Sequence, residues 1–531
     1  MHRVSAFLSQ NRYEPVYLTG LILFALGLPL SKTAMSLALF LLAAHWLIAG
    51  SYRHFPSPGS SARLAFGFFM LIPLMHIAGL LYTADFAFAA KDLRIKLPLL
   101  LLPLFLVTGP HLSRRSFNLV IDAFILAVTA GTIISFVIFL TDNPVEARDL
   151  TPFVSHIRFS MMVVLAAAVI TCMAFNASRP KSIRILAVVL LPWLIFSLAI
   201  LEVLTGLVAF ALLLFAAPVY IFITRPNLTV RLFSAFAIFV LLAALALSWN
   251  VARKEFIPDL EEKKLSMRSH TALGNPYTHD LGSLVNENGN MVWMNVCEDE
   301  MRTAWNDRSS HAFDSELAPG SRTSDVLMRY LSSLGYTKDA EGVDMLTVDD
   351  ITAIERGITN YEYSRWNFAQ RRFDQLKWEY WNYLAGGDPK GHSLLQRWEL
   401  WKVGSRLAND NLLIGVGTGD LKKAFATKLS DTGSSLAGTP LRAHNQYLTI
   451  LITFGIIGLT LFLAALIVPL ALKRSGFGFP MIAFLIIAFA SMFFEDTLET
   501  QVGVSFFAYF YAMWVFQRIS RRDINHQSHQ G

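Results

Sequence analysis

The sequence predicts an all-α polytopic membrane protein, with about twelve transmembrane helices and a large, mostly helical loop before the last three. Hydrophobic residues make up 54% of the 531 residues, and charged residues only 16%. A soluble domain typically has about 25% charged residues. The apolar residues fall in long blocks, such as 97–107 and 159–175, and a spanning helix needs roughly 20 mostly apolar residues. One such block can be a buried core helix, but about a dozen blocks indicate a membrane protein.

Each predicted span is an apolar block bounded by polar or charged residues. The first block has no small-residue cleavage site after it, so we interpret it as a span and not as a removable signal peptide. The connectors at 31–33 and 201–203 are so short that they predict tight hairpins. The predicted spans are 16–31, 33–50, 63–82, 94–109, 117–140, 159–176, 183–201, 203–224, 230–249, 446–472, 478–495 and 500–517.

The charges of the short loops predict the orientation of the chain. One alternate set carries arginine and lysine, such as Arg114 and Arg115, with almost no acidic residues, whereas the opposite set holds Glu495, Asp496 and Glu499. Positively charged loops face the cytoplasm, so both termini are predicted to be cytoplasmic. The predicted parts are nine transmembrane helices in 1–249, an extracytoplasmic loop at 250–441, three transmembrane helices in 442–517 and a cytoplasmic tail at 518–531.

The second half of the large loop is predicted to be helical. Thr347 and Asp350 have the spacing of a capping box, and 371–383 is rich in aromatic and basic residues. A further helix is predicted from Leu394 to about 407. The first half, 265–320, is rich in Gly, Asn, Pro and Asp and receives no assignment.

The two cysteines predict no disulfide. Cys172 lies inside an apolar block and Cys297 in the large loop, so we expect them not to pair.

Several basic residues stand where predicted spans reach the outer face. Arg94, Lys96 and Arg158 lie at span ends, where a charge is costly unless it has a partner or reaches water. Each side chain can instead extend towards lipid headgroups. Arg158 lies beside His156, and the planar guanidinium suits a bidentate grip on phosphate oxygens. Arg94 and Arg158 are therefore candidate ligands of an anionic substrate.

The segment Gln396-Arg397-Trp398-Glu399-Leu400-Trp401 predicts a helix on the membrane surface. Tryptophan is amphipathic and suits the interface, so Trp398 and Trp401 place Arg397 at headgroup height. The alternative is a surface helix with a solvated arginine. A glycine-rich turn follows, with Gly417 and Gly419. Such a turn can cradle phosphate, although a tight turn that approaches a ligand or another helix fits this sequence better.

The last motif is Arg442-Ala443-His444-Asn445, immediately before a predicted span. Histidine is well matched to base catalysis near neutral pH, and arginines around one imidazole suit a diphosphate and a hydroxyl acceptor. A lone histidine here can also be a buried, satisfied side chain. No metal-ligand spacing is present, so no metal site is predicted.

Taken in order, these motifs resemble the O-antigen ligase and Wzy polymerase superfamily. The resemblance rests on Arg397-Trp398, on the glycine stretch 415–420 and on His444-Asn445, placed late in a chain with many spans. Four further segments look like a Bacteroidetes-type branch of the family. They are 93–98, 155–160, 338–343 and 499–503.

This resemblance implies a reaction and its partners. A glycan on undecaprenyl diphosphate moves to an acceptor hydroxyl, most simply of lipid A–core, at the periplasmic face of a bacterial inner membrane. His444 and Arg397 are then the expected catalytic residues, as base and diphosphate ligand. No cofactor, ATP or metal is expected, and the expected partners are the donor, the acceptor and the bilayer, without nucleic acid. The expected substrate-binding residues are Arg94, Arg158, Arg442, Trp398, Trp401, Asn445, Gly417 and Gly419.

One position departs from the family pattern, and several functions stay open. Leu204 stands where the family usually has arginine, and Glu202 adds a negative charge nearby. Another cation therefore replaces that arginine, or donor preference or activity differs. Besides a ligase, the sequence is compatible with a polymerase, a protein O-oligosaccharyltransferase, or a transporter or flippase of a lipid-linked glycan. A transporter should show paired broken helices in two similar halves.

Overall fold

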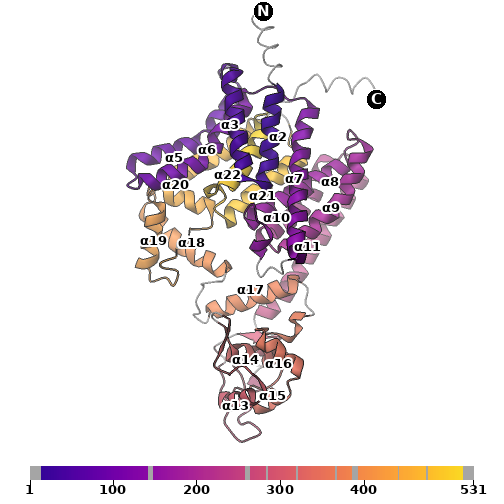
Figure 1. Ribbon diagram of the computed structural model, residues 1–531, viewed down its shortest axis with the longest axis vertical. Coiled ribbons are helices and arrows are strands. Elements are labelled where there is room, and N and C mark those ends of the chain that lie inside the picture. Colours follow the sequence, from indigo (N-terminus) through magenta and orange to yellow (C-terminus); the bar gives the residue numbers. More distant parts are fainter. Residues whose placement is uncertain are drawn as a thin grey trace, which may run out of the picture. The chain divides into compact units, whose positions relative to one another are not determined.

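The structure is a computed structural model that describes residues 14–141, 147–256, 264–280, 282, 285–318, 321–364, 368–384, 393–439, 442–473 and 476–517. The chain divides into two compact units. The membrane-helix unit comprises Met1–Ile238 and Glu399–Gly531, and the loop unit comprises Phe239–Trp398. Figure 1 identifies the elements of both units by label and colour.

The membrane-helix unit is helical throughout its described residues, and every predicted span overlaps one of its helices or α11, which crosses into the loop unit. Two 3₁₀ helices follow α3 and α5, and two more precede α8 and α22. The elements are α2 (Glu14–Leu30), α3 (Lys32–Ile48), η1 (Ser51–His54), α4 (Ser61–Phe69), α5 (Leu71–Ala78), η2 (Gly79–Tyr82), α6 (Phe86–Thr108), α7 (Arg114–Thr141), η3 (Ala147–Leu150), α8 (His156–Ala174), α9 (Lys181–Leu201), α10 (Leu204–Thr224), α11 (Leu228–Phe256), α18 (Ser393–Asp410), α19 (Leu421–Asp431), α20 (Gln446–Ala471), α21 (Phe479–Phe494), η5 (Thr497–Glu499) and α22 (Gln501–Val515).

Seven helices of the described chain are long and apolar enough to cross a membrane. They are Ser61–Tyr82, Arg114–Thr141, His156–Ala174, Lys181–Leu201, Leu204–Thr224, Leu228–Asn250 and Gln446–Ala471. Four shorter apolar helices, α2, α3, α21 and α22, coincide with further predicted spans. The structure thus bears out a mainly helical protein with multiple apolar helices, and the count of about twelve spans stays a prediction.

Both short connectors form tight turns, but only one of the two predicted hairpins is present in the described chain. A single residue, Ser31, separates α2 from α3, which pack against each other, and its hydroxyl accepts a hydrogen bond from the amide of Ala34 at 3.2 Å. Glu202 ends α9 with a left-handed φ of 52°, and α10, which begins at Leu204, packs against α8 and α21 and not alongside α9. The second hairpin prediction is therefore wrong, because a short connector fixes where the next helix begins but not which helix it packs against.

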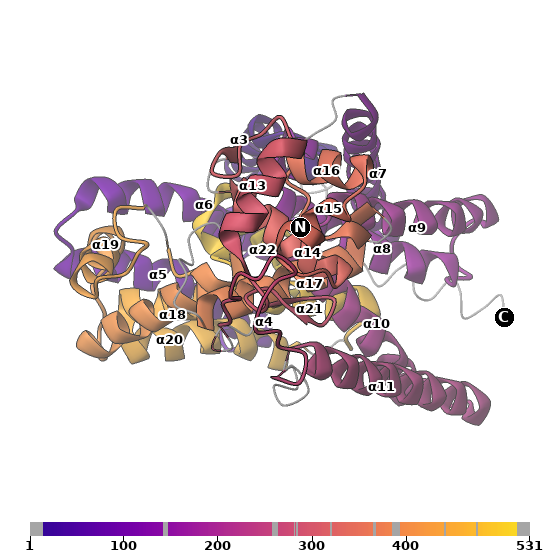
Figure 2. The ribbon, with the colours of Figure 1, turned by 90° about the horizontal axis from the view of Figure 1, so that it is seen from below.

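The centre of the unit is formed by α8 and α22. On α8, 78% of the apolar window is buried inside the protein, and almost every residue of α22 is buried. Aromatic rings of α22 pack in series, with Phe510 and Trp514 stacked at a centroid distance of 5.1 Å. Both views show α8 beside α9 (Figures 1 and 2). The helix α22 is therefore buried and closely packed along most of its length.

One apolar helix, α20, is broken. Gly455 has φ 64° and ψ −166°, and the amide of Ile456 donates to the carbonyl of Leu412 at 2.8 Å instead of to its own helix. A Cβ at Gly455 would lie 2.2 Å from the carbonyl oxygen of Leu413. The break therefore exists because the chain after α18 inserts its backbone there, and only glycine leaves room for it.

The loop unit contains two short hairpins and six helices in its described part, besides the ends of α11 and α18. Its core includes the buried rings of Trp305, Phe313 and Trp381. The unassigned half of the loop, 265–320, forms the first hairpin, α13 and β3 of the second hairpin. The elements are β1 (Asn286–Glu287) paired antiparallel with β2 (Asn290–Met291), α13 (Glu298–Arg308), β3 (Glu316–Ala318) paired antiparallel with β4 (Ser321–Arg322), α14 (Thr323–Leu334), α15 (Ala340–Asp344), α16 (Val348–Glu355), η4 (Tyr361–Ser364) and α17 (Phe368–Leu384).

The helices predicted in the loop are present. Thr347 and Asp350 form a reciprocal capping box at the start of α16, while α17 and α18 cover the other two predicted segments. Cys172 and Cys297 are both free. Residues 399–441 cluster with the membrane-helix unit, since Leu400 of α18 and Phe425 of α19 share a buried core with Ile452 of α20.

Candidate functional site

An acidic connection between α21 and α22 organises the site. It contains Glu495, Asp496 and Glu499, which are all at most 6% exposed. Its fold is local: the Thr500 hydroxyl caps α22 by accepting from the amide of Gly503 at 3.3 Å. A Cβ at Gly503 would lie 2.0 Å from a backbone carbonyl oxygen. Glycine at this position therefore permits the turn that holds three carboxylates together.

Arg158 at the start of α8 binds this connection. Its side chain is buried, and Nη1 lies 3.4 Å from Oε2 of Glu495. Nη2 donates to the carbonyl oxygen of Asp496 at 3.3 Å, while Nε has no hydrogen-bond partner among the described residues. The predicted interfacial arginine is therefore neutralised by an acidic partner, and not by extension towards lipid headgroups.

Lys96 of α6 and Arg442 converge on Glu499. The buried Nζ of Lys96 lies 2.5 Å from Oδ1 of Asp92 and 3.0 Å from Oε2 of Glu499. A guanidinium nitrogen of Arg442 lies 3.6 Å from the same Oε2, and the amide group of Gln446 donates to Oε1 at 3.1 Å. One carboxylate thus compensates two cations from distant parts of the chain.

His444 lies at the rim of this cluster. Its φ of 49° is left-handed, and its backbone amide donates to Oδ2 of Asp496 at 3.0 Å. Its ring Nδ1 lies 3.6 Å from Oε2 of Glu495, and 36% of its side chain is exposed. Asn445 caps α20 by accepting from the amide of Leu448 at 3.0 Å. The backbone therefore holds an accessible imidazole next to a buried carboxylate.

The surroundings shift the two central carboxylates in opposite directions. Burial raises the pKa of Asp496. Burial alone would also raise the pKa of Glu499, but the positive charges of Lys96 and Arg442 hold it below the usual range. Glu499 therefore stays ionised and keeps both cations in place, in line with the effect of neighbouring opposite charges.

Four predicted site residues are not part of this cluster as the structure describes it. Arg94 is exposed on α6, whereas its neighbour Lys96 is buried in the cluster. Arg397 and Trp398 belong to the loop unit, where Trp398 is 52% exposed. Trp401 belongs to the membrane-helix unit and packs edge-on against Phe493 of α21 at 5.5 Å.

The glycine-rich turn is engaged inside the protein. The amide of Gly417 donates to the carbonyl of Thr453 at 2.9 Å, and the amide of Gly419 donates to the hydroxyl of Thr83 at 2.7 Å. Asp420 accepts from the amides of Ala84 and Asp85 at 2.7 and 3.1 Å. The turn therefore fastens the start of α6 to the break in α20, as expected for a tight turn against another helix.

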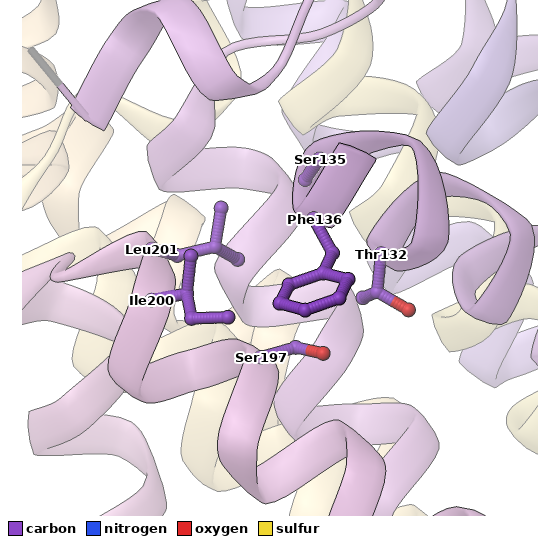
Figure 3. Close-up of a pocket in the computed structure, with 6 residues that line it drawn as sticks. All are labelled: Thr132, Ser135, Phe136, Ser197, Ile200 and Leu201. Atoms are coloured by element: carbon purple, nitrogen blue, oxygen red, sulfur yellow. The ribbon is translucent and has the colours of Figure 1, made fainter. Parts of the chain in front are cut away.

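The position that departs from the family pattern lies at the turn between α9 and α10. Leu204 is half-buried, and Gly206 packs so closely on α8 that a Cβ there would lie 2.7 Å from Ser160. Figure 3 shows a small pocket between α7 and the end of α9. It is lined by Thr132, Ser135, Phe136, Ser197, Ile200 and Leu201, and no predicted site residue contributes to it.

The segment 338–343 has a structural role in the loop unit. Lys338 is buried, and its Nζ donates to the carbonyls of Met291 and Met294 at 2.9 and 3.0 Å. Asp339 caps α15 by accepting from the amide of Gly342 at 2.8 Å. This motif therefore joins β2 to α15.

Sequence reasoning did not select Asp92, Glu495, Asp496 or Glu499 as site residues. The available signal was charge balance, because acidic residues at the outer ends of late spans can neutralise the basic residues at the ends of early spans. Among the residues that the structure describes, no group of three or more His, Cys, Asp or Glu side chains could hold a metal ion.

The comparison with protein families concerns the part of the chain that ends in α20. A family model described as O-Antigen ligase matches residues 358–463, which include α18, α19, His444 and the first part of α20. No curated protein matches the chain. The resemblance predicted from the sequence is thus confirmed, and the chain carries the domain of the O-antigen ligase superfamily over residues 358–463.

Proposed function

We propose that this protein is an O-antigen ligase of a bacterial inner membrane, acting at the periplasmic face. In this proposal it transfers a glycan from undecaprenyl diphosphate to a hydroxyl of lipid A–core. One observation carries the proposal. The accessible ring of His444 stands 3.6 Å from the buried Glu495 carboxylate, in a cluster with Arg158 and Arg442.

The proposed reaction exchanges one bond to the anomeric carbon for another. The acceptor oxygen forms the new bond and gives its proton to His444. The bond between the anomeric carbon and the diphosphate oxygen breaks, and the diphosphate leaves with the electron pair. Because Nδ1 of His444 lies nearest Glu495, we assign Nε2 as the base. Glu495 then compensates the charge of the imidazolium, as a carboxylate does in other histidine-dependent enzymes.

The basic residues have different proposed roles because their exposures differ. Arg442 is 34% exposed at its side chain, so it can offset the charge that develops on the leaving diphosphate. The family resemblance assigns a diphosphate-binding role to Arg397 as well. Arg158 is only 6% exposed, and we assign it to holding Glu495 in position. Arg94 is exposed two residues from the buried Asp92 and Lys96 of α6 and is a further candidate for phosphate oxygens.

The remaining predicted residues support the substrates in this proposal. Trp398 and Trp401 border the acceptor at membrane level, and Asn445 sets the start of α20 beside His444. Gly417 and Gly419 act through position, since their amides already donate within the protein. No metal or nucleotide is part of the proposed chemistry.

The glycan phenotype of a deletion strain tests the proposal. Without a ligase, full-length polymer accumulates on undecaprenyl diphosphate and lipid A–core stays bare. Complementation with His444→Ala should leave the defect while the protein remains abundant, because general base assistance contributes about 100- to 10,000-fold. If lipid A–core instead carries single repeat units and long polymer is missing, the protein is a polymerase. A complete glycan ladder with His444→Ala would show that His444 is not the base.

Two further functions are distinguished by direct assay. Transfer of glycan by the protein in detergent excludes a transporter or flippase, which needs two compartments. The break in α20 is a feature that transporters also use, so this assay is required. Transfer to serine or threonine of a protein acceptor would identify a protein O-oligosaccharyltransferase.

A further inference from the structure

A polar groove runs along α19 in the membrane-helix unit, outside the charged cluster. It lies between α19 and the end of α18, is open to solvent, and encloses about 430 Å³. Small-ligand sites typically measure about 300–1,000 Å³. Seven polar side chains line it together with three apolar ones. The polar ones are Asp410, Asn411, Asp420, Lys423, Thr427, Lys428 and Asp431.

One stripe of α19, a row of three polar side chains along one face of the helix, lines the groove. Lys423, Thr427 and Asp431 follow each other at helical i, i+4, i+8 spacing, so they share one face. All three are exposed, and their side chains make no hydrogen bond or ion pair with any residue the structure describes. By contrast, Lys428 is paired with Asp410 at 2.6 Å, which braces the two walls.

The chemistry of the stripe indicates its ligand. An ammonium donates hydrogen bonds, a carboxylate accepts them and a hydroxyl does both, which matches the alternating donors and acceptors of a polyol. The groove also holds three carboxylates, from Asp410, Asp420 and Asp431, against two lysines. Excess negative charge disfavours a diphosphate or another anion. The lining therefore fits an uncharged, hydroxyl-rich ligand better than a phosphate.

The opposite face of α19 connects the groove to the candidate site. Leu421, Lys422 and Phe425 of α19 line a separate small pocket together with Arg442 and Thr449. Thr449 also donates to Asp496 in the acidic connection at 2.7 Å. A single helix thus presents one face to the charged cluster and another face to the polar groove.

We infer that this groove binds an uncharged sugar chain, at a subsite separate from the residues that handle the diphosphate. The identification of this sugar chain as the transferred glycan or as the acceptor glycan rests on the proposed function. Among the residues that the structure describes, no aromatic side chain lines the groove, so each sugar is held by hydrogen bonds of modest net strength. A dissociation constant on the order of 1 mM follows for a short oligosaccharide, which allows the glycan to leave after transfer.

The test uses the full chain in lipid nanodiscs and linear neutral oligosaccharides of graded length. Binding is measured by saturation-transfer NMR, which needs no transferase activity. Thr427→Trp fills the groove, and Ala426→Trp is the matched control because Ala426 is exposed on the same helix but does not line the groove. Thr427→Trp should weaken binding at least tenfold, and Ala426→Trp should leave it unchanged.

Three outcomes decide the inference. Equal binding by both tryptophan variants and the parent overturns it, and so does competition by inorganic diphosphate. If binding is lost as expected, transfer assays identify the source of the chain: a raised KM only for long lipid-linked donors indicates the donor, and a raised KM only for long acceptors indicates the acceptor. Absence of transfer by the parent protein would overturn the proposed function and leave the sugar-binding result standing.

Discussion

Nδ1 of His444 lies 3.6 Å from Oε2 of Glu495, the same carboxylate oxygen that lies 3.4 Å from the guanidinium of Arg158. The histidine follows the large loop, the glutamate ends α21 and the arginine begins α8. A single buried carboxylate therefore links the candidate base to an early span. This relationship suggests that the base depends on Glu495 for its orientation and for its counter-charge.

Glu495→Gln should lower the transfer rate about tenfold or more, because the imidazolium loses its compensating charge. The loss should not add to that of His444→Ala, since residues acting as one unit are non-additive. A double-mutant cycle on kcat measures this. Glu341→Gln, at an exposed position of the loop unit, is the control. Additive losses would show that Glu495 acts independently of His444.

Arg397→Lys should reduce transfer, and Arg397→Ala should reduce it further. Lysine keeps the charge but loses the planar fork that grips two phosphate oxygens. The matched control is Arg406→Ala, an exposed arginine on the same helix, which should retain activity. Steady-state kinetics with a lipid-linked donor give the comparison. Full activity of Arg397→Ala would show that Arg397 is a solvated surface arginine.

Impermeant thiol labelling of intact spheroplasts tests the orientation. A cysteine at Val348, which is 77% exposed in the loop unit, should react because the positive-inside pattern places the loop outside. A cysteine at Ser182, exposed at the start of α9, should react only after lysis. Both are introduced into a chain without Cys172 and Cys297. Labelling of Ser182→Cys alone in intact spheroplasts would show that the topology is the inverse of the predicted one.

Gly415→Ala should destabilise the protein far more than Gly433→Ala. Both glycines have positive φ, at 71° and 63°, so both variants carry the left-handed strain of about 1–2 kcal/mol. Only at Gly415 would the Cβ also meet backbone, 2.3 Å from the carbonyl carbon of Thr453, and such overpacking adds about 1–3 kcal/mol. Thermal unfolding in detergent gives the difference. Equal melting temperatures would mean that the turn does not depend on this contact.

The loop unit should become more stable as pH rises from 8 to 9. Burial lowers the pKa of Lys338 from 10.5 to about 8, so the folded state releases this proton before the unfolded state does. Below pH 8 the Lys338 ammonium is charged in both the folded and the unfolded state, and its burial destabilises the folded state most. Above pH 8 this destabilisation falls by about 1 kcal/mol per pH unit. Lys338→Met removes the titrating group.

Hydrogen exchange of α14 amides in the full chain, corrected for intrinsic rates, measures this effect. The opening free energy of the parent should rise relative to that of Lys338→Met between pH 8 and 9. A difference that does not change with pH would show that Lys338 remains protonated when buried.

Much of this architecture was predictable from contiguous sequence. Hydropathy places a helix at every predicted span, the short connector around Ser31 predicts the hairpin of α2 and α3, and Thr347 with Asp350 predicts the cap of α16. The connector around Glu202 predicts a tight turn, but not that α10 packs on α8 and α21. His444 and Arg158 were also identifiable, because a charged or titratable residue at the end of an apolar block is conspicuous. These features depend on local patterns of charge and hydropathy, which neighbouring residues carry by themselves.

Only the tertiary structure decided which charges meet. Glu495 and Glu499 follow Arg158 and Lys96 by more than three hundred residues, and their pairing depends on how α6, α8 and α22 pack. The same holds for the break at Gly455, which exists because a distant turn inserts its backbone into α20. Buried charges and backbone groups need partners. The sequence shows that such a partner is required, but only the packing of the helices determines which residue it is.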